Sequence, residues 1–261
     1  MSNLNASGKE SKRSMGALAM PTGGALRADT APARRAINTE FDPVTHIARV
    51  DKVLWPSVAQ LEREFKLIDF SMVPDERLIY KQQIGLRVHA ASVLLDNGSL
   101  DEDHFDKTFP ECVPYLDAYR KFRTIEDFAP IVKEVRLFSK KWRFHGAPDE
   151  AGTHLGLYQG HLCVVDYKCS YIMYPATGPQ CCGYEMLIRE NADELGIDKA
   201  LFKKKVIRMG LLLKPTGNYD PIFFNDPRDM MEFQACVLLH WSRREKFKTM
   251  TEEDLLRIYA N

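Results

Sequence analysis

The stretch Gly146–Cys169 reads GAPDEAGTHLGLYQGHLCVVDYKC and places charged residues inside segments that are otherwise apolar. Its charged motifs are PD at Pro148–Asp149 and DYK at Asp166–Lys168. A charge buried in a protein is costly unless it is paired or bound to a metal ion. The stretch therefore predicts either a structural ion pair or a site that handles a cation and an anionic substrate.

Strand alternation decides which of these side chains share a face. Successive side chains of a strand point to opposite faces, so Asp166 and Lys168 project together while Tyr167 points the other way. A hairpin would bring Asp149, on the preceding strand, beside Asp166. Two such carboxylates repel unless a divalent cation lies between them, and Mg²⁺ prefers one or two carboxylates with water and phosphate oxygens. A nearby lysine can orient attacking water or stabilise charge on phosphate, so the set suits phosphodiester hydrolysis.

Hydropathy patterns on both sides of this stretch predict further strands and helices. Residues 132–139 (VKEVRLFS) alternate as a half-buried strand does, and residues 141–158 are predicted to form a second strand with a glycine-rich bend. Residues 161–169 are predicted to form a third, buried strand. The remaining predicted elements are a helix over 180–195, a hairpin of strands 206–214 and 219–224, and a closing helix with Asp226 as its cap and Pro227 in its first turn.

The N-terminal half is predicted to be mostly helical. The expected elements are helices over 58–68 (N-cap Ser57), 75–95 and 113–122, with a loop at 96–103. Residues 1–40 are rich in Ser, Ala, Gly and basic residues without sustained periodicity, which is typical of a disordered, mildly basic tail. The order of elements predicts an α/β domain over residues 41–261, with a central mixed β-sheet flanked by helices and a helical region before it.

Composition points to no special partner. The chain has 36 Lys and Arg against 36 Asp and Glu, and 45% of its 261 residues are apolar, which is ordinary for a globular protein. No apolar run is long enough to span a bilayer and the N-terminus lacks the apolar core of a signal peptide, so we expect a soluble, cytoplasmic protein without a membrane partner.

Six cysteines are present without a CxxC pair. In a chain without a secretion signal this argues against a disulfide framework, and the spacing does not support an iron–sulfur cluster. Cys163 and Cys169 lie in or beside an apolar run, where we expect a free cysteine to behave as a small hydrophobic residue.

The ordered motifs resemble the PD-(D/E)xK nuclease superfamily, whose signature is PD, a gap of strand length, and then D or E, any residue, and K. Here the signature falls at Pro148–Asp149 and Asp166–Lys168. The chain is most similar to the RecB-type exonuclease branch, which includes phage members. In that branch a helical histidine precedes the core and matches His89 in GLRVH, and a glutamate on the strand before PD matches Glu134. A Q-x-x-x-Y pair on the following helix matches Gln180 and Tyr184.

The resemblance extends from about Phe41 to the closing helix, and WPSV at Trp55–Val58 is similar to an entry motif of phage proteins in the group. It implies a restriction-endonuclease-like catalytic core over 131–261, preceded by the mostly helical part at 41–130. One departure is Cys169, which stands where the branch usually has Thr.

The resemblance also implies roles for these residues. Asp149 and Asp166 would hold one or two Mg²⁺ or Mn²⁺ ions, helped by His89 and the backbone carbonyl of Tyr167. The remaining matched residues, which would complete the catalytic set, are Lys168 to assist the attacking water, Gln180 and Tyr184 to support substrate and lysine, and Glu134.

Each of these residues also has a purely structural interpretation. Asp149, Asp166 and Lys168 could form a buried ion-pair network. His89 could be a core histidine, and Glu134 could pair with a neighbouring cation. Gln180 could satisfy backbone groups and Tyr184 could belong to the core.

Other polar residues carry weaker signals. His145, His154 and His161 show no tight ligand pair, so we expect surface histidines rather than a zinc site. Basic patches at 139–143, 202–205 and 242–248 could be solvated faces or could contact a phosphate backbone. Within the first of these, Trp142 could stack on a base or belong to the core.

The sequence and its resemblance together predict a metal-dependent DNA nuclease, an exonuclease acting on single- or double-stranded DNA with ends. The resemblance suggests a phage-type role in recombination, replication or DNA processing, with a partner protein from that machinery and an oligomer both allowed. The alternatives are a non-catalytic DNA-binding or assembly protein with the same fold and a structure-specific endonuclease.

Overall fold

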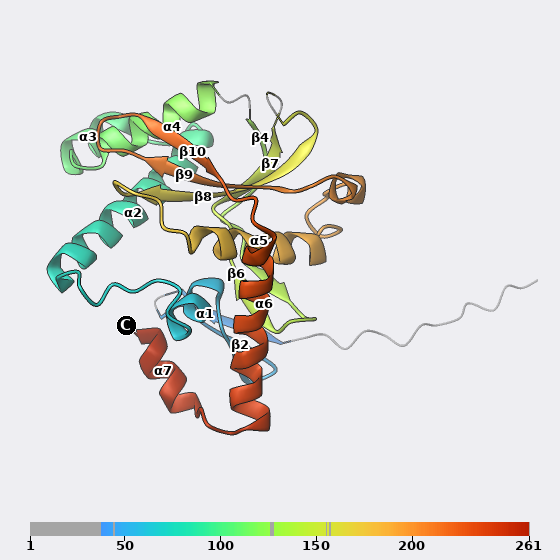
Figure 1. The fold of residues 1–261 in the computed structure, drawn as a ribbon. Coiled ribbons are helices and arrows are strands. Elements are labelled where there is room, and N and C mark those ends of the chain that lie inside the picture. Colours follow the sequence, from blue (N-terminus) through green and yellow to red (C-terminus); the bar gives the residue numbers. More distant parts are fainter. Residues whose placement is uncertain (1–37, 44, 126–127, 155, 157, 261) are drawn as a thin grey trace, which may run out of the picture. The chain divides into compact units, whose positions relative to one another are not determined.

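Five strands form a mixed sheet in the part of the chain that the structure describes (Figure 1). The structure is a computed structural model and describes residues 38–43, 45–125, 128–154, 156 and 158–260. The strands are β4 (Phe128–Lys133), β7 (Glu150–His154), β8 (His161–Cys169), β9 (Ile207–Leu213) and β10 (Tyr219–Phe223). They lie in the order β10-β9-β8-β7-β4, with β8 parallel to β9 and the other pairs antiparallel. The predicted α/β class with a central mixed sheet is confirmed.

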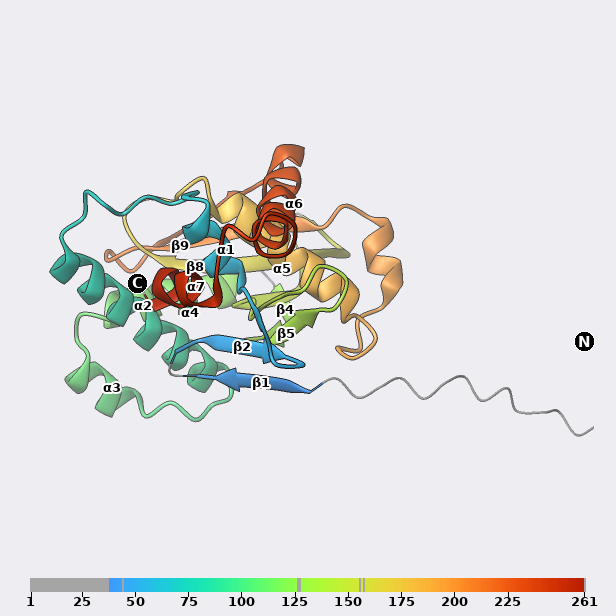
Figure 2. The ribbon, with the colours of Figure 1, turned by 90° about the horizontal axis from the view of Figure 1, so that it is seen from below.

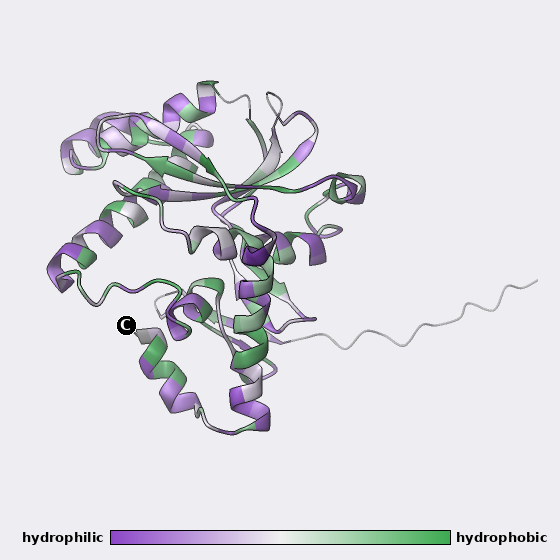
Figure 3. Ribbon diagram, viewed as in Figure 1, coloured by the Kyte–Doolittle hydropathy of each residue, from purple (hydrophilic) through white to green (hydrophobic). Residues whose placement is uncertain are grey.

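Helices cover both faces of this sheet. The helices α5 (Thr177–Glu190) and α6 (Pro227–Trp241) lie on one face, and α2 (Asp75–Asp96), α3 (Glu102–Thr108) and α4 (Val113–Ile125) lie on the other (Figure 1). Strand alternation divides β8 between two apolar clusters. Leu162 and Val164 pack with α5 and α6, while Cys163 and Val165 pack with α2 and α4. Figure 3 shows hydrophobic residues concentrated in the central strands and hydrophilic ones on outward-facing parts of the helices.

All five predicted helices are present. Ser57 caps α1 (Val58–Glu64) through a reciprocal capping box with Gln60, although the helix ends four residues before the predicted end. Helices α2 and α4 occupy the predicted segments, and α4 continues three residues further. Helix α5 begins three residues before the predicted start and ends at Glu190. Asp226 caps α6 as predicted, with Pro227 at its first position.

Several strand predictions need correction. The predicted strand 132–139 is two strands, because Glu134 adopts a left-handed backbone with φ of 51° and separates β4 from β5 (Leu137–Ser139). The predicted strand 141–158 is also two strands: β6 (Phe144–Gly146) pairs with β5 in a separate ribbon, whereas β7 belongs to the central sheet. The 161–169 strand and the 206–224 hairpin are confirmed.

The N-terminal region contains strands that the sequence did not predict. Strands β1 (Thr39–Asp42), β2 (Ile47–Val50) and β3 (Val53–Trp55) form a small antiparallel sheet. The tail predicted over 1–40 lies outside the described residues up to position 37, and its last two residues belong to β1. The boundary prediction is wrong there because a four-residue exposed strand carries little hydrophobic signal.

Two further helices were missed. The predicted loop 96–103 ends early because Asp101 caps α3. After α6 and a π-helical turn, Ser242–Lys246, the chain forms α7 (Glu252–Ala260), which packs through Leu255 and Tyr259 against Leu54 of β3. Figure 2, seen from below, shows α7 and α1 beneath the central sheet. A single-turn 3-10 helix, Lys199–Lys203, precedes β9.

None of the helices in the described ranges is long and apolar enough to cross a membrane.

Candidate functional site

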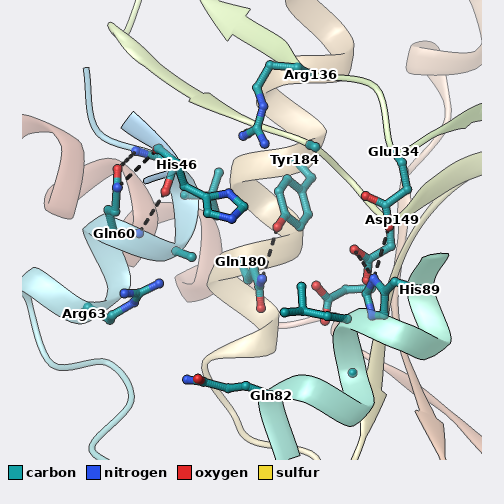
Figure 4. A pocket seen from close by; sticks show the side chains of 18 of the residues that line it. His46, Gln60, Arg63, Gln82, His89, Glu134, Arg136, Asp149, Gln180 and Tyr184 are labelled. Atoms are coloured by element: carbon teal, nitrogen blue, oxygen red, sulfur yellow. Dashed lines mark hydrogen bonds and ion pairs between the residues drawn. The ribbon is translucent and has the colours of Figure 1, made fainter. Parts of the chain in front are cut away.

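A cavity of about 960 Å³ opens beside the ends of β7 and β8 and gathers the residues predicted from the motifs (Figure 4). Its walls come from α1, α2, α5 and α7 and from the connections around β4, β6 and β7. All eight predicted site residues line it: His89, Glu134, Asp149, Asp166, Tyr167, Lys168, Gln180 and Tyr184.

His89, Glu134 and Asp149 form a compact group on one wall. Nδ1 of His89 lies 3.1 Å from Oε1 of Glu134 and 3.4 Å from Oδ1 of Asp149. One ligand atom from each of the three residues lies within 4.8 Å of the other two, which is a spacing at which they could share a metal ion. Figure 4 shows the three side chains converging from different elements. Sequence analysis expected Asp166 rather than Glu134 to be the second principal carboxylate.

The backbone around Glu134 explains its position. Its left-handed conformation turns the chain directly after β4, and its N–H points to the carbonyls of Pro148 and Asp149, at 3.1 and 3.2 Å. A non-glycine residue in this conformation is uncommon, and such outliers concentrate at functional sites. The turn fixes Glu134 beside the PD segment, although its place in the sequence suggested a regular strand.

The charges of this group are strongly coupled. Burial lowers the pKa of His89, but the Asp149 and Glu134 carboxylates outweigh burial and raise that pKa to about 10. Burial would raise the pKa of Asp149, yet the His89 charge holds it below its ordinary value. His89 is therefore an imidazolium that neutralises part of the carboxylate charge when no other cation is bound.

A second chain of contacts runs from Asp166 to α5. Nζ of Lys168 lies 2.6 Å from Oδ2 of Asp166 and donates to Oε1 of Gln180 at 3.0 Å. The Gln180 amide in turn donates to the Tyr184 hydroxyl at 3.2 Å. The prediction that Asp166 and Lys168 share a face is confirmed, and Gln180 holds the lysine from the neighbouring helix.

Burial perturbs both ends of this ion pair. Burial raises the pKa of Asp166 to about 6, opposed by Lys168 and assisted by the nearby Asp149 charge. Burial lowers the pKa of Lys168, but Asp166 and Asp149 outweigh it and raise the pKa above its ordinary value. Lys168 is thus a fixed ammonium, suited to stabilising negative charge rather than to removing a proton.

Tyr167 links the two groups through its backbone. Its N–H donates to Oδ2 of Asp149 at 2.6 Å, which leaves the other oxygen of Asp149 directed towards His89. Two carboxylates and one imidazole form a donor set that could hold a divalent metal ion. Asp166 and the Tyr167 main chain lie outside the group of three, although both line the same cavity.

The opposite wall of the cavity is cationic, and sequence analysis did not single it out. Arg63 of α1 and Arg136, which follows β4, point into the cavity on either side of His46 (Figure 4). Burial lowers the pKa of His46, and the charges of the two arginines lower it further. Arg136 stacks its guanidinium 4.1 Å above the Phe41 ring. These residues belong to no motif, so only the folded arrangement identifies them.

Glu62 is a further carboxyl that the sequence did not indicate. It lies on α1 with 3% of its surface exposed, and Oε1 has no hydrogen-bond partner among the described residues. Burial raises its pKa to about 8, while the charge of Lys168 acts in the opposite direction. Glu62 is therefore a neutral carboxylic acid near the lysine at neutral pH.

The histidine prediction is wrong for two residues. His145 and His154 are 0% and 2% exposed, because both lie in strands whose faces are covered. His161 is half-buried, and Nδ1 lies 2.8 Å from the carbonyl oxygen of Lys205. Trp142 packs at the edge of the apolar cluster under α5 and α6, with Lys141 Nζ 5.5 Å from its ring centroid.

No protein-family model matches this chain, and no curated protein matches it.

Proposed function

We propose that the protein is a metal-dependent DNA nuclease of the PD-(D/E)xK type, acting as an exonuclease. The observation that carries the proposal is the convergence of His89, Glu134 and Asp149 within reach of one ion, in the same cavity as the Asp166–Lys168 pair. These residues come from α2, the β4–β5 turn, the PD segment and β8, so they are far apart in the sequence. The mixed sheet with α5 between β8 and β9 is compatible with the restriction-endonuclease-like core that the motifs suggest.

The chain's own residues account for the main requirements of phosphodiester hydrolysis. His89, Glu134 and Asp149 would hold Mg²⁺ or Mn²⁺, with Asp166 available from the neighbouring position on the cavity wall. When bound, the ion would supply Lewis-acid stabilisation of charge on the phosphate. Because the Asp149 and Glu134 carboxylates raise the pKa of His89, metal binding through its ring nitrogen would release a proton.

Lys168 and the arginines would act on the substrate. The Lys168 ammonium, fixed by Asp166 and Gln180, is placed to orient an attacking water and to stabilise negative charge as it develops on the phosphate. Arg63 and Arg136 on the opposite wall would bind backbone phosphates of the nucleic acid. The cavity thus offers a cation site on one side and an anion site on the other.

The proposal is tested by digestion of end-labelled linear DNA, single- and double-stranded, beside a closed circle, with Mg²⁺ or Mn²⁺. We expect loss of the linear DNA alone, abolished in Lys168→Ala and unchanged in Lys199→Ala, which removes an exposed lysine paired with Asp193. Cleavage of the circle would instead identify an endonuclease. Intact DNA in every reaction with folded protein would contradict nuclease activity.

Metal binding separates the enzyme from a DNA-binding protein with the same fold. Titration calorimetry of the DNA-free protein with Mn²⁺ should show binding that Asp149→Asn weakens strongly. The absence of Mn²⁺ binding by the wild-type protein would refute the proposed site directly.

A further inference from the structure

A polar network begins at the buried Tyr167, on the side of β8 that faces away from Asp166 and Lys168. The Tyr167 hydroxyl donates to Oε2 of Glu150, a residue with 0% exposure. Oε1 of the same carboxylate accepts from Arg123 of α4 at 2.9 Å. Glu150 therefore connects β7 and β8 to the helical layer above the sheet.

The network continues to α2 and β4. Arg123 lies 3.4 Å from Oδ1 of Asp96, the last residue of α2, and Lys133 lies 2.6 Å from Oδ2 of the same carboxylate. Lys133 also donates to the carbonyl of Ser92 at 3.1 Å. The Tyr119 hydroxyl donates to Asp96 at 2.7 Å. Two carboxylates and two cations thus balance one another. Glu150 is fully buried, whereas the side chains of Asp96, Arg123 and Lys133 are 18%, 20% and 14% exposed.

Three members of this network are sequence neighbours of candidate site residues. Lys133 precedes Glu134, Glu150 follows Asp149, and Tyr167 stands between Asp166 and Lys168. The Cα atoms of such neighbours are only about 3.8 Å apart, so fixing one side chain restrains the backbone that carries the other.

Helix α2 also contacts the network, but through residues that lie one and two helical turns from the candidate ligand rather than next to it in the sequence. Ser92 and Asp96, which contact the network, lie one and two turns beyond His89 on this helix. The His89 ring also packs edge-on against the Tyr167 ring, with centroids 5.6 Å apart. All three residues of the metal-binding group are therefore held by the network, each through its own backbone element.

Stability alone is a poor explanation for the fully buried carboxylate of Glu150, whose charged partners in the network keep part of their surface exposed. Burying an ion costs several kcal/mol, and apolar residues of similar volume often replace a buried ion pair without loss of stability. A network that is costly and that contacts every element carrying a metal-binding side chain is better explained by the geometry it imposes. Groups behind metal ligands commonly fix ligand orientation and tune affinity.

We propose that the Glu150–Tyr167 pair, with the network behind it, positions His89, Glu134 and Asp149 for metal binding. The inference rests on the proposed metal site and assigns to Tyr167 a role through its side chain. Tyr167, which separates Asp from Lys in the DYK motif, is thereby a positioning residue. Its hydroxyl binds Glu150 on the face of β8 opposite Asp166 and Lys168.

Tyr167→Phe tests this role, because it removes the hydroxyl while keeping the ring and the backbone N–H that contacts Asp149. Tyr115→Phe is a matched control: Tyr115 is buried in the same apolar cluster, and its hydroxyl accepts from Lys81 at 3.0 Å, away from the network. Mn²⁺ affinity is measured by titration calorimetry of the DNA-free proteins, and thermal unfolding shows whether each variant is folded. Glu150→Gln provides a second variant if Tyr167→Phe does not fold.

We expect Tyr167→Phe or Glu150→Gln to weaken Mn²⁺ binding about 10-fold or more, as changes behind metal ligands commonly do, and Tyr115→Phe to leave it unchanged. We also expect excess Mn²⁺ to restore the hydrolysis rate of the positioning variants, which would not follow from general destabilisation. Wild-type Mn²⁺ affinity in both variants, or an equal loss in Tyr115→Phe, overturns the inference while leaving the proposed function intact. Failure of the wild-type protein to bind Mn²⁺ refutes the metal site, and the inference with it.

Discussion

Replacement of Glu62 by Gln should stabilise the protein at alkaline pH. Burial raises the pKa of this carboxyl from 4.5 to about 8. Below pH 4.5 the folded and unfolded chains both hold the proton. Between pH 4.5 and about 8 the unfolded chain releases the proton while the folded chain keeps it, so the free energy of unfolding falls as pH rises through this window. Above about pH 8 the folded chain also ionises and the loss levels off.

The size of the effect follows from the same values. A difference between 4.5 and about 8 corresponds to about 5 kcal/mol at 1.36 kcal/mol per pKa unit. Local relaxation and water entry reduce the cost of a buried charge, so we expect a change of about 2–4 kcal/mol. Gln cannot ionise and has nearly the same shape, so the variant should lack this pH-dependent loss.

Urea unfolding followed by circular dichroism at pH 5, 7 and 9 measures the difference between variant and wild type. Glu62→Gln should gain stability relative to wild type from pH 5 to pH 9. Glu253→Gln, which makes the same substitution at an exposed surface pair with Arg257, controls for the loss of a surface carboxylate. If the free energy of unfolding of Glu62→Gln differs from that of wild type by the same amount at pH 5, 7 and 9, the argument that burial keeps Glu62 neutral is refuted.

Three further outcomes follow from individual contacts. Ser57→Ala removes the capping box of α1 and should lower the free energy of unfolding by about 1 kcal/mol, measured by urea denaturation. Arg63→Ala and Arg136→Ala should weaken binding of a labelled oligonucleotide in metal-free buffer and reduce the salt dependence of that binding. Their Mn²⁺ affinity, measured by calorimetry, should stay the same. Unchanged oligonucleotide affinity would exclude the cationic wall from substrate binding. Burial lowers the pKa of His145 to about 3. As pH falls from 6.5 towards 3, the unfolded chain therefore binds a proton at this residue and the folded chain does not, which lowers the free energy of unfolding. His145→Gln should therefore lose less stability than wild type over that range in acid titrations of unfolding, and parallel titrations would contradict this.

The sequence predicted the elements that carry strong periodic or capping signals. Residues 161–169 combine an apolar run with strand length, and Ser57 and Asp226 stand directly before periodic helices, so these boundaries were found. The strands at 39–55 were missed because three or four residues with mixed exposure carry too little pattern. The break at Glu134 was missed because nothing in VKEVRLFS indicates a left-handed residue.

Some features of the candidate site could also be predicted from local sequence, and others depend on tertiary packing. Asp166 and Lys168 share a face by strand alternation alone, which local sequence can show. The contact of His89 with Glu134 and Asp149 depends on how α2 packs over the sheet, which local pattern could not show. The motif resemblance implied that His89 and Asp149 share a metal site, but it paired them with Asp166 rather than Glu134. Arg63 and Arg136 line the cavity, and Glu62 comes near Lys168, only through tertiary packing, so no spacing in the sequence could have indicated them.

Along β8, cavity residues (Asp166 and Lys168) alternate with a residue of the supporting network (Tyr167). This alternation also affects which register the strand adopts during folding. A strand that slips by one residue exchanges its two faces. In β8 such a slip would press Asp166 and Lys168 into the apolar cluster under α2 and α4 and turn Tyr167 towards the cavity, away from Glu150. A hairpin in the wrong register would thus bury unpaired charges in the core and remove the hydrogen bond between Tyr167 and Glu150. The polar side chains of β8 therefore also favour the correct strand register. Only that register places Asp166 and Lys168 in the cavity and Tyr167 against Glu150 at the same time.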